Sequence, residues 1–194
     1  YYDAADFIVA TAAKTRFDEV SSTRWNPDSL TQNLITTHIV DGTFDKDQVI
    51  LNRIIKTGEW TQQDSDDLSS SGRAVLTLIS GPNVDAAREA ITSLNSRTTQ
   101  FLENISPSTN IGNLKAEVLL MHDSSDKLVP PEESRRFAKA IESNGRRVYH
   151  TEFSLFQRAV QVHMDDSKGL NTLDFLKQAG KLYIHMYNVM RLSE

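Results

Sequence analysis

The chain has 194 residues, of which 39% are hydrophobic and 24% are charged, and its formal net charge is −5. This composition is typical of a globular protein with enough apolar residues to bury a sizeable core. With 26 acidic residues against 21 basic ones, the chain lacks the basic excess of nucleic-acid-binding proteins. Nucleic acid is therefore not an expected partner.

No apolar stretch reaches the roughly 18 residues that are needed to cross a bilayer. The first residues also lack a basic segment ahead of an apolar one, so we expect neither a membrane span nor a signal peptide. The absence of cysteine excludes disulfides and thiolate metal sites but leaves the compartment open. Because the chain begins at Tyr1 rather than at methionine, we expect it to be a piece of a longer protein.

Apolar residues recur at helical spacing through most of the first hundred positions. This pattern predicts helices over residues 2–14, 30–39, 45–56, 64–79, 84–94 and 98–105. In the third of these helices the apolar face comprises Val49, Ile50, Ile54 and Ile55. Residues 16–28 are expected to form a loop, in which Trp25 packs as a buried side chain.

The C-terminal third reads as strand, acidic loop, helix, strand and long helix. The apolar run 118–121 predicts a short buried strand, and Pro130-Pro131 followed by acidic residues predicts a helix start. Asn144-Gly145 ends that helix, and residues 147–153 alternate as a second strand that a helical crossover makes parallel to the first. The last helix, residues 171–190, is expected to cover the sheet with an apolar stripe made of Phe175, Leu176, Leu182, Tyr183, Met186 and Met190.

The string AEVLLMHDSSDKLVPPEESRRFAKAI, residues 116–141, resembles the strand, acidic turn and helix near the C-terminus of α/β-hydrolases. In that family a strand ending in His-Gly is followed by an Asp and then by Val-Pro. The resemblance covers roughly residues 105–167 and implies that Asp126 is the acid of a Ser, Asp, His triad. It also implies that His163, one helix and one strand later, is the triad histidine. The usual glycine is Asp123 here, which places another charge near the acid.

This resemblance implies an α/β fold class: a helix-rich fragment with the last two parallel strands of an α/β-hydrolase-like sheet. We expect an N-terminal helix and loop over residues 1–27, a helical lid over 28–106 and the C-terminal hydrolase part over 107–194. The loops that carry Asp126 and His163 would then meet at one edge of the sheet, because the carboxyl ends of parallel strands lie together. There the acid would orient the histidine, which takes the proton of a nucleophile.

The nucleophile itself is missing from the chain. A hydrolase elbow needs Gly-x-Ser-x-Gly, and no two of the eight glycines are four positions apart. Ser71-Gly72 and Ser80-Gly81 follow helical runs rather than strands, so neither is expected to be a nucleophile. In a chain ordered Ser, Asp, His, the serine would lie upstream of Tyr1.

Two functions remain open at this point. The first is the C-terminal portion of a serine hydrolase for an ester, amide or related acyl substrate, inactive alone. The second is a non-catalytic binding or assembly module of hydrolase ancestry. Neither needs a cofactor or metal, and the candidate ligand sets, which are His122, Asp123 and Asp126 or His163, Asp165 and Asp166, show no fixed metal spacing. His38, His150 and His185 are expected to be structural or exposed.

The bare edge of a two-stranded sheet is expected to recruit a partner. We expect a homo-oligomer, or pairing with the missing N-terminal part of the protein. The residues expected near that contact are Leu119, Leu120, Val75 and Leu76.

Overall fold

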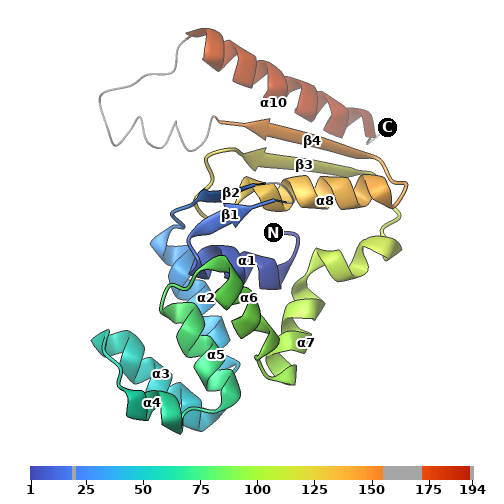
Figure 1. Ribbon diagram of the computed structural model, residues 1–194. Helices are drawn as coiled ribbons and strands as arrows, with labels where there is room; N and C mark the ends of the chain where they lie inside the picture. Colours follow the sequence, from blue (N-terminus) through green and yellow to red (C-terminus); the bar gives the residue numbers. More distant parts are fainter. Residues whose placement is uncertain (19–20, 155–171, 193–194) are drawn as a thin grey trace.

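The computed structural model describes residues 1–18, 21–154 and 172–192 (Figure 1). It contains a two-stranded parallel sheet, a separate antiparallel pair of short strands, and many helices. The coarse expectation of a helix-rich α/β class is confirmed. The helices are α1 (Ala4–Ala12), α2 (Ser29–Asp41), α3 (Asp45–Thr57), α4 (Gln62–Asp67), α5 (Ser70–Ile79), α6 (Val84–Thr92), α7 (Ser96–Ile105), the 3-10 helix η1 (Pro107–Asn113), α8 (Pro131–Ser143) and α10 (Thr172–Leu192).

The parallel sheet consists of β3 (Val118–Asp123) and β4 (Val148–Phe153). Helix α8 packs on one face of this sheet and α10 on the other, as Figure 1 shows. The two strands pair in parallel, which confirms the predicted pairing. The first strand is longer than its apolar run, because backbone pairing continues through His122, opposite Glu152, to the last residue of both strands.

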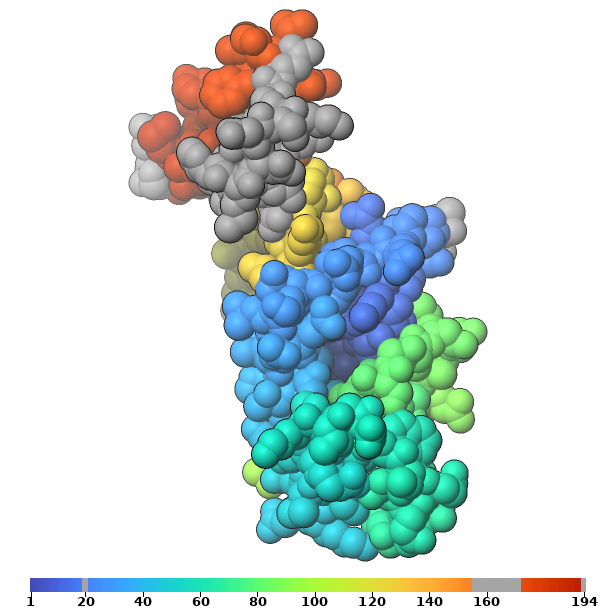
Figure 2. Space-filling view, turned by 90° about the vertical axis from the view of Figure 1, so that its left-hand side faces the viewer, coloured from blue at the N-terminus to red at the C-terminus, as the bar shows by residue number. Residues whose placement is uncertain are grey.

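The helical part of the chain has its own core, to which α1, α2, α3, α5, α6 and α7 contribute. Its largest fully buried side chains are Leu51, Val9, Val40 and Val75. In the space-filling view of Figure 2 the molecule is elongated, with α3 and α4 at one end and α10 at the other. Helix α1 packs within this helical core, close to α8, so the helical part reaches the sheet part through α8.

Helix boundaries follow side-chain caps that the sequence encodes locally. Asp3, Asp28, Ser69, Asn83 and Asn95 each accept a hydrogen bond from a backbone N–H in the first turn of the helix that they precede. These side chains satisfy donors that have no partner within the helix. The caps account for the positions at which α1, α2, α5, α6 and α7 begin.

The single helix expected over residues 64–79 is two helices, α4 and α5, so that prediction is wrong. Leu68 is extended, and Ser69 begins a new helix by accepting a hydrogen bond from Gly72 N at 3.0 Å. The buried carboxylate of Asp47 in turn accepts from Ser69 N at 3.0 Å. A capping serine held by a residue of α3 therefore interrupts the helical pattern.

The loop expected over residues 16–28 contains an antiparallel pair, β1 (Thr15–Phe17) and β2 (Ser22–Arg24), which corrects that expectation. Arg16 lies opposite Thr23, and its guanidinium donates to the threonine hydroxyl at 2.9 Å. Strands of three residues are too short to show the alternation that identifies a strand in sequence. Trp25, which follows, is 6% exposed, as expected.

Two predicted apolar faces differ from those observed. In α3, Val49 is 73% exposed, whereas Leu51 and Ile54 are buried. In α10, five of the six stripe residues are 45–70% exposed, namely Phe175, Leu176, Tyr183, Met186 and Met190. The face of α10 that meets the sheet is more polar, with buried His185 2.9 Å from the hydroxyl of Thr151. The helix covers the sheet as expected, but the predicted stripe faces outward.

Candidate functional site

The predicted triad acid lies in the acidic loop, residues 124–130, between β3 and α8. The loop turns directly after the strand, because Asp126 N donates to the carbonyl oxygen of Asp123 at 3.1 Å. The carboxylate of Asp123 also accepts from Ser125 N at 2.8 Å. Asp123, at the position where the resemblance led us to expect a glycine, is buried and holds the turn with its side chain. The loop therefore closes without the missing glycine.

Backbone donors fix the orientation of the Asp126 carboxylate. Its Oδ1 accepts hydrogen bonds from Leu128 N at 2.6 Å and from Val129 N at 3.3 Å. Its Oδ2 lies 3.5 Å from Nε2 of His122, and the side chain is 23% exposed. The site thus presents a carboxylate with one oxygen fixed by the loop and the other directed to a histidine ring.

His122 is the histidine that the structure places beside Asp126. Its Nε2 lies 3.1 Å from the carbonyl oxygen of Val129. A carbonyl only accepts hydrogen bonds, so Nε2 carries a proton and donates. Sequence reasoning treated His122 as a candidate metal ligand and missed this contact, although the loop between the two residues is short enough to return Asp126 to the strand end. His122 therefore stabilises the loop that holds the acid.

The predicted base, His163, lies outside the described residues, and its pairing with Asp126 stays a prediction. The structure does place the strand that precedes it. The carbonyl oxygen of Phe153, the last residue of β4, accepts a hydrogen bond from Ser124 N at 2.8 Å. The chain therefore leaves β4 beside the start of the acidic loop, the arrangement that a parallel sheet gives to neighbouring strand ends.

Residues 25–31, which lead into α2, contact three consecutive carbonyl groups of the acidic loop. The indole N–H of Trp25 donates to the carbonyl oxygen of Asp126 at 3.2 Å. Asp28 N donates to the carbonyl of residue 127 at 2.8 Å, and the Thr31 hydroxyl donates to that of Leu128 at 3.2 Å. The start of the expected lid and the backbone of the acid are thus hydrogen-bonded together. This second role of Trp25 was not expected from the sequence.

A second polar cluster lies between α8 and β4. The hydroxyl of Ser134 is 3.0 Å from Nε2 of His150 and 2.9 Å from the carbonyl oxygen of Pro131. The carbonyl can only accept, so the serine proton is directed to it and the histidine nitrogen donates to the serine. Glu152 forms a two-pronged ion pair with Arg135, at 2.5 and 2.7 Å. The cluster contains the serine and histidine of an activated nucleophile. However, the histidine donates a proton to the serine oxygen and does not accept one from it, so the contact is structural.

We expect acid to destabilise the fold in two steps through this cluster. Burial lowers the pKa of His150 below its ordinary 6.5, and the hydrogen bond from Arg135 lowers the pKa of Glu152 below its ordinary 4.5. Both groups bind fewer protons in the folded state than in the unfolded state. Their contributions to the free energy of unfolding are therefore present above the ordinary pKa and are lost as the pH falls. The urea midpoint should therefore drop first below about pH 6.5 and again below about pH 4.5.

The substitution His150→Gln keeps a donor for Ser134 but removes the upper titration. The slope of the urea midpoint between about pH 7.5 and 5.5 should flatten in this variant, and the lower step should remain. An unchanged upper slope would contradict the assignment to His150.

The two Ser-Gly pairs are not placed as nucleophiles. Ser71 is buried in α5, and its hydroxyl accepts a hydrogen bond from Asn95 N at 3.1 Å. The hydroxyl of Ser80 donates to the carbonyl oxygen of Leu76 at 2.7 Å. Ser71 therefore contributes to helix packing, and Ser80 to the end of α5.

Within the described residues, no group of three or more His, Asp or Glu side chains is arranged to hold a metal ion. The alternative set His163, Asp165 and Asp166 lies outside them. No described helix has the length and apolar character of a membrane span.

Searches of protein-family models, curated proteins and solved structures found no match to the chain. The chemistry of the acidic loop is therefore the basis for the function proposed below.

Proposed function

We propose that the chain is the lid and C-terminal part of an α/β-hydrolase-like serine hydrolase that acts on an ester, amide or related acyl substrate. In this proposal Asp126 orients His163, and His163 serves first as general base and then as general acid. The nucleophile and the oxyanion hole come from a segment outside these 194 residues. The protein needs no cofactor or metal for this chemistry.

The observation that carries the proposal is the carboxylate at the end of a parallel strand. Asp126 follows β3, its Oδ1 is held by Leu128 N and Val129 N, and its Oδ2 retains acceptor capacity. The neighbouring strand β4 ends at Phe153 at the same edge of the sheet, ten positions before His163 in the sequence. An oriented carboxylate beside the exit of the next parallel strand is what an acid–histidine pair requires.

A non-catalytic binding or assembly module is the second candidate. It is favoured by the three hydrogen bonds between residues 25–31 and the acidic loop, which make this loop a structural joint. Oδ2 of Asp126 also has His122 as a nearby partner. In such a module Asp126 would only hold the turn.

The chain alone is expected not to react with a fluorophosphonate probe or to hydrolyse acyl esters. It contains no Gly-x-Ser-x-Gly, and Ser71, Ser80 and Ser134 donate to or accept from neighbouring groups without an aligned base. Mass spectrometry of the probe-treated protein should show the unmodified mass. Stoichiometric labelling of any serine would contradict the proposal.

A chain extended at its N-terminus distinguishes the two candidate functions. The hydrolase proposal requires a Gly-x-Ser-x-Gly between a strand and a helix upstream, and labelling of that serine. An upstream segment without such a serine would favour the binding module.

The proposal also includes association through the sheet part of the chain. Among the described residues, β3 pairs with β4 alone, so its other edge has no strand partner. On the outer face of α10, Phe175, Leu176, Tyr183 and Met186 are 45–70% exposed. Val75 and Leu76, expected near the contact, are buried in the helical core at 0% and 5%, which excludes them from it. The expected contact therefore shifts to β3 and α10.

We expect the isolated chain to form a homodimer or larger assembly at micromolar concentration, measurable by light scattering. In the full-length protein, we expect the N-terminal part to cover the surface of β3 and α10 that a second copy covers in the homodimer. The double substitution Tyr183→Glu and Met186→Lys should increase the monomer fraction. The control Val49→Glu changes an equally exposed apolar residue on α3 and should leave the mass unchanged. A monomeric parent chain would exclude self-association.

A further inference from the structure

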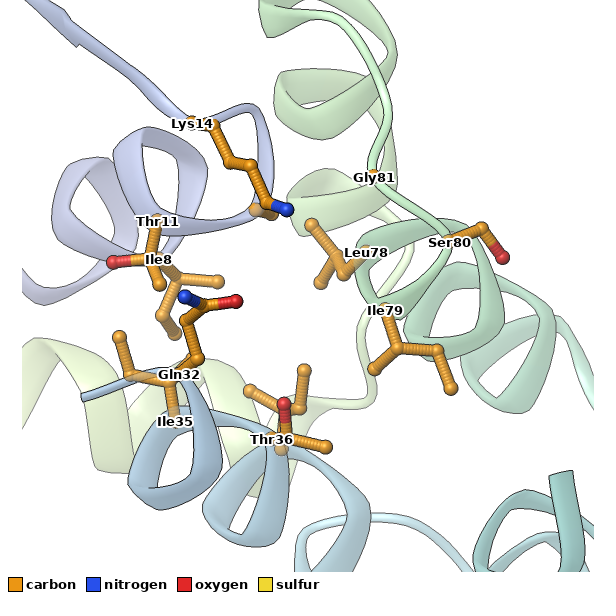
Figure 3. A pocket seen from close by; sticks show the side chains of 12 residues that line it. Ile8, Thr11, Lys14, Gln32, Ile35, Thr36, Leu78, Ile79, Ser80 and Gly81 are labelled. Carbon is orange, nitrogen blue, oxygen red and sulfur yellow. The ribbon is translucent and has the colours of Figure 1, made fainter. Parts of the chain in front are cut away.

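A cavity of about 190 Å³ lies between α1, α2 and α5, within the helical part of the chain. Figure 3 shows Ile8 and Ile35 on one side of this cavity, and Leu78 and Ile79 on the other. Its remaining lining residues are Thr11, Ala12, Lys14, Gln32, Thr36, Ile39, Ser80 and Gly81. The lining therefore combines aliphatic side chains with polar ones, of which Lys14 and Ser80 are exposed to solvent. Small-molecule sites combine apolar side chains with polar groups that fix the orientation of the ligand.

Lys14 directs its ammonium group into this cavity, beside the carboxamide of Gln32 (Figure 3). The described residues offer the ammonium no hydrogen bond or ion pair, and none of the lining residues is acidic. The Gln32 amide nitrogen donates to Pro27 O at 2.8 Å, which fixes this side chain with its oxygen on the side of Lys14 (Figure 3). The ammonium of Lys14 is thus the cationic donor that faces a hollow lined in part by aliphatic side chains.

The backbone of Lys14 is held in an unusual conformation that aims this side chain. Its φ is +49°, the left-handed region that favours glycine or asparagine, and it is the only described residue other than glycine with a positive φ. Lys14 N donates to Thr11 O at 3.3 Å, and Lys14 O accepts from Trp25 N at 2.8 Å. Such conformations persist where the surroundings enforce them, and they cluster at ligand-binding sites.

We propose that this cavity binds a small carboxylic acid with a short aliphatic or aromatic tail. Its carboxylate accepts from the Lys14 ammonium, and its tail lies among Ile8, Ile35 and Leu78. An apolar cavity of about 150 Å³ holds a benzene molecule, so a cavity of 190 Å³ suits a tail of about six carbons. A single lysine matches a singly charged carboxylate better than a doubly charged phosphate. This inference is independent of the proposed hydrolase activity, because it concerns binding by the chain itself.

The test is a titration of the ¹⁵N-labelled chain with sodium hexanoate, followed by NMR. We expect saturable shifts of amides that line the cavity, with a Kd on the order of a millimolar for so small a ligand. Hexanamide, which has the same tail without the charge, should bind at least about tenfold more weakly. Inorganic phosphate, which has charge without the tail, should cause no saturable shift at the cavity.

Two variants assign the contacts. Lys14→Met keeps the length of the side chain and should raise the Kd for hexanoate by about tenfold or more. Lys46→Met removes an exposed lysine on α3 that does not line the cavity, and should change the Kd by less than about twofold. Thr36→Phe fills the cavity from α2 and should abolish binding, while far-UV circular dichroism shows a retained fold.

Three results would overturn the inference. They are equal affinity for hexanoate and hexanamide, an unchanged Kd in Lys14→Met, and an absence of saturable shifts at the cavity. Binding that survives in Thr36→Phe would place the ligand elsewhere and would likewise overturn it.

Discussion

Replacing Asp126 with asparagine is expected to lower kcat/KM by about 10³- to 10⁴-fold in a chain that also contains the nucleophile. Asparagine keeps an oxygen that can accept from Leu128 N and Val129 N, the two bonds that hold the loop at 2.6 and 3.3 Å. It replaces the second oxygen with an NH₂ group, so it removes the charge that, in the proposed function, stabilises the imidazolium of His163. The loss should therefore come from chemistry and not from unfolding.

The matched control for this substitution is Asp28→Asn. Asp28 also accepts a hydrogen bond from the N–H two residues later, Leu30 N at 2.8 Å, and it lies in the segment that contacts the acidic loop. Its replacement should change kcat/KM by less than about twofold and stability by a few tenths of a kcal/mol. A loss of less than about tenfold in Asp126→Asn would mean that Asp126 is a loop-capping residue, as in the binding module.

The sheet part was predictable because its signals are local. Pro130-Pro131 and the acidic residues after it mark the start of α8 within one residue. Gly145 has the positive φ, +71°, that its Asn-Gly context predicts after the helix. A helix of 13 residues between two strands then requires a crossover, and a crossover makes them parallel. Each step depends on neighbours in the sequence.

The partners of the acidic loop were not predictable for the opposite reason. Trp25 and Asp126 are 101 positions apart, and no local pattern relates an indole in one loop to a carbonyl in another. The break between α4 and α5 likewise depends on Asp47, which lies 22 positions before Ser69. Contacts of this kind follow from how helices pack, and the periodicity of one segment does not contain that information.

The outward stripe of α10 shows a further limit of periodicity. The spacing of Phe175, Leu176, Tyr183 and Met186 does identify one face of a helix, but it cannot say what that face meets. The sheet contacts the neighbouring face, through His185 and Lys181, whose ammonium donates to Glu152 O at 2.8 Å. An apolar pattern therefore identifies the face of a helix that is suited to burial. It does not identify the element that covers this face.

Replacing Arg136 with methionine is expected to destabilise the chain by about 3 kcal/mol. Arg136 lies on α8 and forms ion pairs with Glu133 on the same helix and with Asp6 on α1. Glu133 is 3% exposed, and its Oε2 accepts from Tyr2 N at 2.8 Å and from Asp3 N at 3.1 Å. Without the guanidinium, this buried carboxylate loses the cation with which it pairs.

The neighbouring substitution Arg135→Met is the matched control for this effect, on the same helix and with the same change of side chain. Arg135 pairs with Glu152 at 2.5 Å and with the buried Glu132 at 3.2 Å, but its side chain is 44% exposed against 20% for Arg136. Arg16 also lies 3.7 Å from Glu132, so water and Arg16 replace most of what is lost. Its cost should stay below about 1 kcal/mol. For a chain of this length, Arg136→Met should lower the Tm by about 6–12 °C and Arg135→Met by no more than about 4 °C. Equal shifts would mean that the ion pairs between α1 and α8 do not hold the helical part against the sheet part.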